Sequence, residues 1–139
     1  MKPKTTVTKG NLIDRRWHLV DLDGQTLGRA CVKIASLLMG KSKVDYSPNR
    51  DAGDYVVAIN AQKIRVTGNK KTDKVYYHHT GYAGHLKELT LDQLLTKDAR
   101  QVIEIGVKGM LPKNKLRDRR LTRLKIFVDG QHLYNDKIK

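Results

Sequence analysis

The chain has 139 residues and a mass of 15.8 kDa, which is the size of a single domain. Its 28 lysines and arginines against 14 acids give a net charge of +14 at pH 7, which points to nucleic acid first and an anionic membrane surface second. The single cysteine, Cys31, excludes an internal disulfide and a cysteine-rich zinc site. No apolar run approaches the length of a membrane span, and residues 1–10 lack the apolar core of a signal peptide. We therefore expect a soluble, cytoplasmic protein.

The first part of the chain predicts a strand, a helix and a second strand after a basic lead-in over residues 1–14. Residues 17–21 have a pattern typical of a short strand. Thr26 is a suitable N-cap for a helix that runs to Met39, because apolar residues recur there at helical spacing, and Gly40 is a natural stop. Residues 55–59 are nearly all apolar and rich in β-branched side chains, which predicts a strand buried on both faces of a parallel sheet.

The second part predicts short strands, two helices and a last strand. Residues 63–66 alternate as a short strand does, residues 68–71 indicate a basic turn, and residues 74–79 are extended. Thr90 and Asp98 each begin a helix, because a glutamine follows each three residues later at the capping-box position. A basic helix or turn at 113–120, a strand at 124–128 and a tail at 130–139 complete the chain.

This order of elements predicts the α/β class. We expect one domain over residues 1–139, built as a small three-layer α/β/α domain with a short, mostly parallel central sheet and basic loops and tails.

The excess positive charge is concentrated in two segments. Residues 63–87 contain six basic residues and one acid, and residues 108–125 contain eight basic residues and one acid. Within one domain, two such segments indicate a binding face for a polyanion rather than a surface charged only for solubility. Tyr76, Tyr77 and Tyr82 interleave with lysines in the first segment, as base stacking combined with phosphate neutralisation requires. We expect one of Tyr76 and Tyr77 to face the core.

Several motifs suggest enzyme or metal chemistry but are incomplete. The Gly40-Lys41-Ser42 tripeptide follows a helix instead of opening one, and it lacks the earlier glycine of a phosphate loop. The Gly24–Gly28 segment lacks the full dinucleotide fingerprint, so a tight turn is the better interpretation. The adjacent residues His78 and His79 point to opposite faces of a strand, which argues against a zinc site with His85. Contact with RNA is the better functional interpretation, and exposed histidines without a function are the alternative. We interpret Cys31 as core packing, and the aspartates as turn residues, namely Asp21, Asp23, Asp51 and Asp54.

A set of motifs over residues 17–132 resembles the ribosomal protein L13 family of bacterial type. The strongest match is the segment Val107-Lys108-Gly109-Met110-Leu111-Pro112-Lys113-Asn114. Further matches occur in the expected order, and they are Thr26-Leu27-Gly28-Arg29, Gly40-Lys41, Tyr46-Ser47-Pro48, Gly53-Asp54, Ile59-Asn60-Ala61, Thr67-Gly68 and Tyr76 to Gly84.

The chain departs from the family pattern at four places. Arg117 stands where the family usually has glycine, Ala83 where it has proline and Asn49 where it has histidine. Near the end, His132-Leu133-Tyr134 replaces a typical His-Pro-His. These departures affect local detail at the turn after Leu116, at the tail and at any contact made by Asn49.

The resemblance implies a structural constituent of the large ribosomal subunit that binds large-subunit ribosomal RNA, supports early subunit assembly and translation, and uses neither a cofactor nor a metal. It implies neighbouring large-subunit proteins as further partners, no membrane, no homo-oligomer and a place in cytoplasmic ribosomes. The candidate RNA-binding residues are basic or aromatic, and they are Arg15, Arg16, Lys41, Lys43, Lys70, Lys71, Lys74, Tyr77, His79, Tyr82, Lys87, Lys108, Lys113, Lys115, Arg117, Arg119, Arg120 and Arg123.

Two other functions follow from the same features. A small α/β enzyme acting on nucleotides or RNA would need a convergent acid–base set, and the sequence shows none. A free regulatory protein that binds messenger RNA would use the same basic face. We expect residues 1–10 and the last few residues to fold only on RNA.

Overall fold

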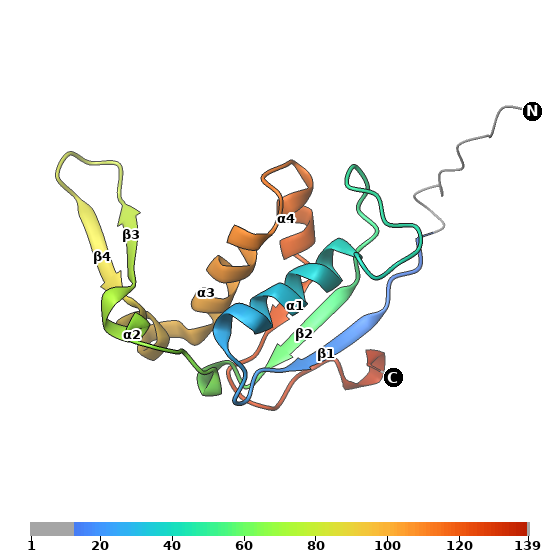
Figure 1. Ribbon diagram of the computed structural model, residues 1–139, viewed down its shortest axis with the longest axis horizontal. Coiled ribbons are helices and arrows are strands. Elements are labelled where there is room, and N and C mark those ends of the chain that lie inside the picture. Colours follow the sequence, from blue (N-terminus) through green and yellow to red (C-terminus); the bar gives the residue numbers. More distant parts are fainter. Residues whose placement is uncertain (1–12, 139) are drawn as a thin grey trace, which may run out of the picture.

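A three-stranded parallel sheet forms the centre of the fold in the computed structural model, which describes residues 13–138 (Figure 1). Strands β1 (Trp17–Asp21), β2 (Tyr55–Ile59) and β5 (Leu124–Ile126) lie in the order β1-β2-β5. Both pairings are parallel, with Val20 opposite Ala58 and Ala58 opposite Ile126. The first two strands have the predicted bounds, and the last is shorter than predicted. The prediction that residues 1–10 fold only on RNA concerns a segment outside the described residues.

Two long helices connect these strands. Helix α1 (Leu27–Met39) follows Thr26, whose side chain makes no capping hydrogen bond, and it ends at Gly40 in the left-handed conformation with φ 74°. Helix α3 (Leu91–Met110) begins with the predicted capping box of Thr90 and Gln93. Asp98 has non-helical angles inside α3 (φ −159°, ψ 99°), so the predicted second helix start is present as a kink within one element.

Both helices cover the same face of the sheet. Val56 and Ala58 of β2 are fully buried in one cluster with Ile34 of α1 and Ile103 of α3. Because both crossovers move in the same direction along the sheet, right-handed connections place both helices on one side.

The opposite face of the sheet is covered by the C-terminal segment. There, the ring of Trp17 stacks on Tyr55 at 4.4 Å and on Tyr134 at 5.0 Å between centroids. The α/β class and the parallel sheet are thus confirmed. The layer on that face is formed by an extended tail that includes a short 3-10 helix, η3 (Asn135–Lys137).

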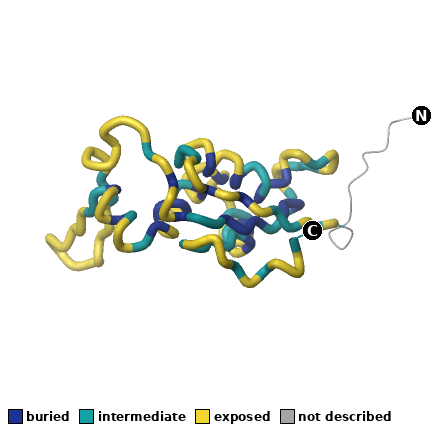
Figure 2. The backbone as a smooth tube through the Cα atoms, turned by 90° about the horizontal axis from the view of Figure 1, so that it is seen from below, coloured by how far each residue is buried: buried dark blue, intermediate teal, exposed yellow. Residues whose placement is uncertain are grey.

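A β-hairpin projects from the end of the body near the start of α3 (Figure 1). It consists of β3 (Val75–His79) and β4 (Leu86–Thr90), which pair antiparallel. The sequence predicted the first strand but not the second. Figure 2 shows that the hairpin is largely exposed, whereas the buried segments lie within the body.

The remaining short elements connect the body to the hairpin and to the last strand. The predicted strand at 63–66 is wrong: a 3-10 helix, η2 (Ala61–Lys63), stands at its start, and Arg65 forms one isolated bridge with Thr26. The predicted basic turn is a short helix, α2 (Lys70–Asp73), and the predicted basic helix is α4 (Leu116–Leu121). Between residues 13 and 138, no helix combines the length and apolar character needed to cross a membrane.

Candidate nucleic-acid interface

The exposed face of the hairpin carries three of the predicted aromatic residues. Tyr77 is 64% exposed and Tyr82 is 74% exposed, and His79 is also exposed. On alternating strand residues, Tyr77 and His79 share one face, and Lys87 lies on the other face opposite His78. Tyr82 meets His85 edge-on at 6.1 Å between ring centroids, and His79 Nδ1 accepts a hydrogen bond from the Gly81 N–H at 3.0 Å. The three rings are nevertheless exposed and available to stack on bases.

Tyr76 is the tyrosine that faces the core, as one of the pair was predicted to do. Its ring packs against the small cluster formed by Leu91, Leu94 and Val102. The ammonium of Lys74 lies 5.2 Å from the ring centroid, in cation–π range. The phenol oxygen is buried and has no hydrogen-bond partner within the described residues.

The predicted lysines next to the hairpin are available to solvent. Lys70, Lys71 and Lys74 at α2 are exposed, and none of them forms an ion pair with the described residues. Asp73 is the one acid in this helix. This end of the molecule therefore presents a set of uncompensated positive charges beside exposed aromatic rings.

A second group of cations lies around the connection from α3 to α4. Lys108, Lys113, Lys115 and Arg119 are exposed and form no ion pair with residues 13–138. Arg117 is half-buried, and its Nε is a buried donor without a partner there.

The loop after α1 lies beside α4. It contains exposed Lys41, and its Arg50 carbonyl accepts a hydrogen bond from Arg120 of α4 at 3.1 Å. In Figure 1 this loop, the α3–α4 connection and the hairpin tip all project toward the upper edge of the view.

Two predicted RNA-binding arginines belong to the core instead. Arg120 and Arg123 are only 1% and 6% exposed. Arg123 donates from Nη1 and Nη2 to both carboxylate oxygens of Asp51, at 2.6 and 2.5 Å, and Arg120 Nε lies 3.6 Å from the same carboxylate. Buried and paired guanidinium groups cannot reach a phosphate, so the prediction for these two residues is corrected.

Arg15 is also engaged with the Asp51 loop. It donates hydrogen bonds of 2.9 Å to the carbonyl oxygens of Gly53 and Asp51, and its guanidinium lies 3.6 Å from the Asp51 carboxylate. Burial raises the pKa of the Asp51 carboxyl, but the hydrogen bonds and charge of Arg123 and the charges of Arg15 and Arg120 outweigh it. The pKa of Asp51 therefore lies below its ordinary value.

A neighbouring carboxylate, Asp54, binds Lys43. Asp54 is 2% exposed, forms an ion pair with Lys43, and accepts 2.9 Å and 3.0 Å hydrogen bonds from the His18 ring and the Arg16 backbone N–H. Burial raises the pKa of the Asp54 carboxyl, but these partners lower it by more, so its net pKa is below the ordinary value. Lys43 is thus largely committed to Asp54, whereas the side chain of Arg16 is 75% exposed with Asp14 at 3.5 Å.

The sequence did not reveal the role of these two aspartates. Asp51 and Asp54 anchor four cations that are distant in the sequence, whereas Asp21 fits the predicted turn role, since it accepts a hydrogen bond from the backbone of Asp23. Two aspartates on either side of a glycine, just before an apolar strand, resemble ordinary loop residues. Their partners are distant in the sequence, so no local pattern indicates the ion pairs.

Cys31 lies in the core as predicted. Its side chain is 1% exposed, and burial raises the pKa of the thiol to about 11, so it is uncharged at neutral pH. Within residues 13–138, no group of three histidine, cysteine or acidic side chains has the arrangement of a metal site.

Three exposed cations near the start of α1 are absent from the residues predicted from the sequence. Arg29 and Lys33 lie four residues apart on the outer face of α1, and Arg65 lies beside Thr26. None of the three forms an ion pair with the described residues. Their helical spacing was a signal, but they fall outside, or at the edge of, the two charge-rich segments.

Comparison with known proteins identifies the family. The model of the family described as Ribosomal protein L13 matches residues 15–133. The chain is also similar to the large ribosomal subunit protein uL13 of Vesicomyosocius okutanii subsp. Calyptogena okutanii (strain HA), with 51% identity over 131 residues, which cover 94% of this chain and 92% of that relative. Both matches extend over nearly all the described elements. The chain therefore belongs to the ribosomal protein L13 family.

Proposed function

We propose that this chain, a ribosomal protein of the large subunit and not an enzyme, binds large-subunit ribosomal RNA and supports early subunit assembly and translation. The relative named above is a large ribosomal subunit protein. We further propose that residues 1–139 act as one domain in cytoplasmic ribosomes, next to other large-subunit proteins and without forming a homo-oligomer.

The observation that carries this proposal is a set of exposed cations without an ion-pair partner among residues 13–138. Its members are Lys41, Lys70, Lys71, Lys74, Lys87, Lys108, Lys113, Lys115 and Arg119. A surface kept only for solubility mixes both signs of charge. Uncompensated cations release condensed counterions when they neutralise phosphates, which supplies much of the affinity for RNA.

The hairpin adds contacts of another kind. Tyr77, His79 and Tyr82 are exposed on an element that projects from the body, where they can reach unpaired bases or riboses. Arg16 and Arg117 remain partly available and extend the proposed surface. Arg15 and Lys43 serve it indirectly, because their bonds to the Asp51 and Asp54 segment hold the loop that carries Lys41.

The test is binding to naked large-subunit ribosomal RNA and to an equal mass of transfer RNA across a salt series. Wild type is compared with Lys113→Ala/Lys115→Ala and with the control Lys97→Ala, which removes an exposed lysine outside the proposed surface. We expect preference for ribosomal RNA. The first variant should reduce the slope of log affinity against log salt by about 0.7–0.9 for each lost phosphate contact, and the control should not.

Equal binding of wild type to both RNAs, lost together as salt rises, contradicts specific recognition. Co-sedimentation separates a ribosomal role from free regulation of messenger RNA, because a ribosomal protein stays with large subunits at high salt. In a reconstitution series, incorporation before most other proteins is the result expected for an early assembly role.

A further inference from the structure

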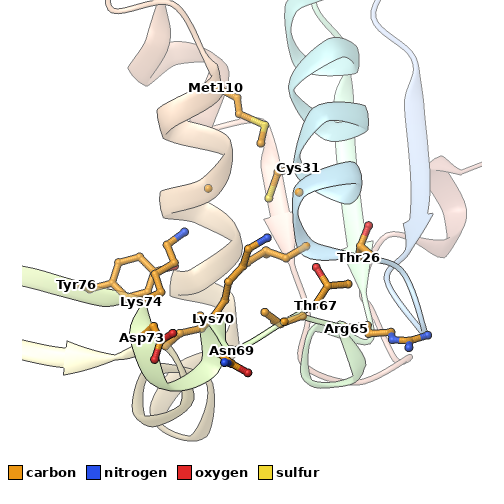
Figure 3. Close-up of a pocket in the computed structure, with 16 residues that line it drawn as sticks. Thr26, Cys31, Arg65, Thr67, Asn69, Lys70, Asp73, Lys74, Tyr76 and Met110 are labelled. Atoms are coloured by element: carbon orange, nitrogen blue, oxygen red, sulfur yellow. The ribbon is translucent and has the colours of Figure 1, made fainter.

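A hollow between α1, α2 and α3 is not explained by the contacts described so far. Its volume is about 560 Å³, within the range of about 300–1,000 Å³ that small-molecule sites occupy. Figure 3 shows Cys31 of α1 and Met110 of α3 at its upper end and the side chain of Lys70 reaching up from α2 into the space between the helices.

The inner wall of the hollow is apolar and uncharged. Leu27, Val66 and Leu91 line it together with Cys31, whose thiol remains protonated at neutral pH. An apolar wall of this kind fits the faces of a planar ring.

Two hydroxyl groups lie at the edge of the hollow. The buried hydroxyl of Tyr76 has no hydrogen-bond partner in the described part of the chain, and the Thr26 side chain makes no capping bond to α1. Hydroxyls both donate and accept hydrogen bonds, as the edge of a nucleobase requires.

The charge around the hollow favours a phosphate-bearing ligand. Lys70 and Lys74 line it and form no ion pair with residues 13–138, and Asp73 is its one acidic lining residue. A shallow groove continues from it along the outer face of α1, where it is lined by Arg29 and Lys33. Both depressions share Gly28 and Lys70, so a chain of phosphates can leave the hollow along a second pair of cations.

We propose that this hollow holds one unstacked nucleotide of the ribosomal RNA, with its base against the apolar wall and its flanking phosphates on Lys70 and the α1 groove. The inference rests on the proposed RNA-binding function and adds a base-specific site to it. An apolar protein segment in the same place would bury the Lys70 ammonium without a partner, which is costly.

Gly28 provides a way to close the hollow without disturbing the fold. A Cβ atom at this position would meet no atom within 4 Å, and its φ is not in the left-handed region. Both Gly28→Leu and the matched control Gly28→Ala should fold, because alanine and leucine favour a helix more than glycine does. Only the leucine is large enough to obstruct the hollow.

The experiment measures the affinity of the full chain for large-subunit ribosomal RNA and maps reactive bases with base-specific chemical probes. We expect Gly28→Leu to bind about tenfold more weakly, as the loss of one base contact predicts, and Gly28→Ala to bind within about twofold of wild type. One base protected by wild type and by Gly28→Ala should become reactive with Gly28→Leu, while the rest of the footprint persists.

Three results overturn the inference. In the first, Gly28→Leu binds and protects as wild type does, which leaves the proposed function intact. In the second, the two variants lose affinity equally, which assigns the effect to the α1 backbone. In the third, Gly28→Leu keeps the RNA footprint of wild type but is incorporated poorly into large subunits in the reconstitution series. That result assigns the hollow to a neighbouring protein. Failure of wild type to prefer ribosomal RNA instead contradicts the proposed function itself.

Discussion

Arg123 and Asp51 form a two-pronged ion pair between residues 72 positions apart, with donor–acceptor distances of 2.6 and 2.5 Å. Their side chains are only 8% and 16% exposed. The Arg123 carbonyl also accepts a hydrogen bond from the backbone N–H of Val56 at the start of β2. The pair therefore ties the segment before β5 to the loop that precedes the central strand.

Replacing Arg123 with alanine should destabilise the protein by about 3–5 kcal/mol, because it leaves the Asp51 carboxylate buried with less compensation. Urea unfolding of wild type and Arg123→Ala measures this difference. The matched variant is Arg119→Ala, at an exposed position on α4 without an ion pair among the described residues. We expect it to change stability by less than about 0.5 kcal/mol.

The effects of the two substitutions on RNA binding should be the reverse of their effects on stability. At a temperature where Arg123→Ala is still folded, its RNA affinity should depend on salt as steeply as that of wild type. The salt dependence of Arg119→Ala should be reduced by about one phosphate contact. A reduced salt slope for folded Arg123→Ala would show that its guanidinium reaches RNA and would contradict the core assignment.

The elements with strong periodic or capping signals were predictable from sequence. The strands at 17–21 and 55–59, the helix ending at Gly40, the Thr90–Gln93 capping box and the helix start at Asp98 all rest on local residue patterns, and all are present. Each of these signals consists of residues close together in the sequence, so it can be recognised without knowing the fold.

The missed features depend on contacts between distant segments. Strand β4 is mostly exposed and has a weak alternating pattern, and its identity comes from its pairing with β3. In the basic segment 108–125, composition did not distinguish buried Arg120 and Arg123 from exposed Arg119. The distinction arises from Asp51, which sequence reasoning assigned to a turn, and from the packing of α4 against the loop before β2.

The low pKa values of Asp51 and Asp54 predict a loss of stability in acid. A carboxyl with a folded-state pKa below its unfolded value stabilises the fold at pH values above the unfolded value of about 3.9. That contribution disappears as the pH falls from about 4 through the lower folded-state pKa.

The variant Asp51→Asn tests this dependence because its side chain does not titrate. In urea unfolding from pH 7 to pH 2.5, the stability difference between wild type and Asp51→Asn should be constant down to about pH 5 and should shrink below about pH 4. A difference that is the same at pH 7 and pH 2.5 would show that the Asp51 charge does not stabilise the fold.

Gly106 and Cys31 predict a coupled effect at the contact of α1 and α3. A Cβ atom on Gly106 would lie 2.7 Å from the Cys31 sulfur, which is too close for an unstrained contact. Gly106→Ala should cost about 1–3 kcal/mol through overpacking, partly offset by the higher helix propensity of alanine. The double variant Cys31→Ala/Gly106→Ala should be more stable than Gly106→Ala, because the sulfur is gone. Thermal unfolding of the two single variants and the double variant gives the coupling energy, and purely additive effects would contradict this steric explanation.

The exposed tyrosines of the hairpin should contribute to RNA affinity but not to stability. Tyr77→Ala and Tyr82→Ala remove rings that are 64% and 74% exposed, so each should leave the unfolding free energy within about 0.5 kcal/mol of wild type. If each ring stacks on a base, each variant should weaken RNA binding by about 1–3 kcal/mol without changing the salt slope, since no phosphate contact is lost. Tyr55→Phe is the control, because it keeps the ring that stacks on Trp17 and removes a hydroxyl outside the hairpin. Full affinity in both Tyr77→Ala and Tyr82→Ala would restrict RNA recognition to the cationic surface, since the hairpin would then project from the body without contacting a base.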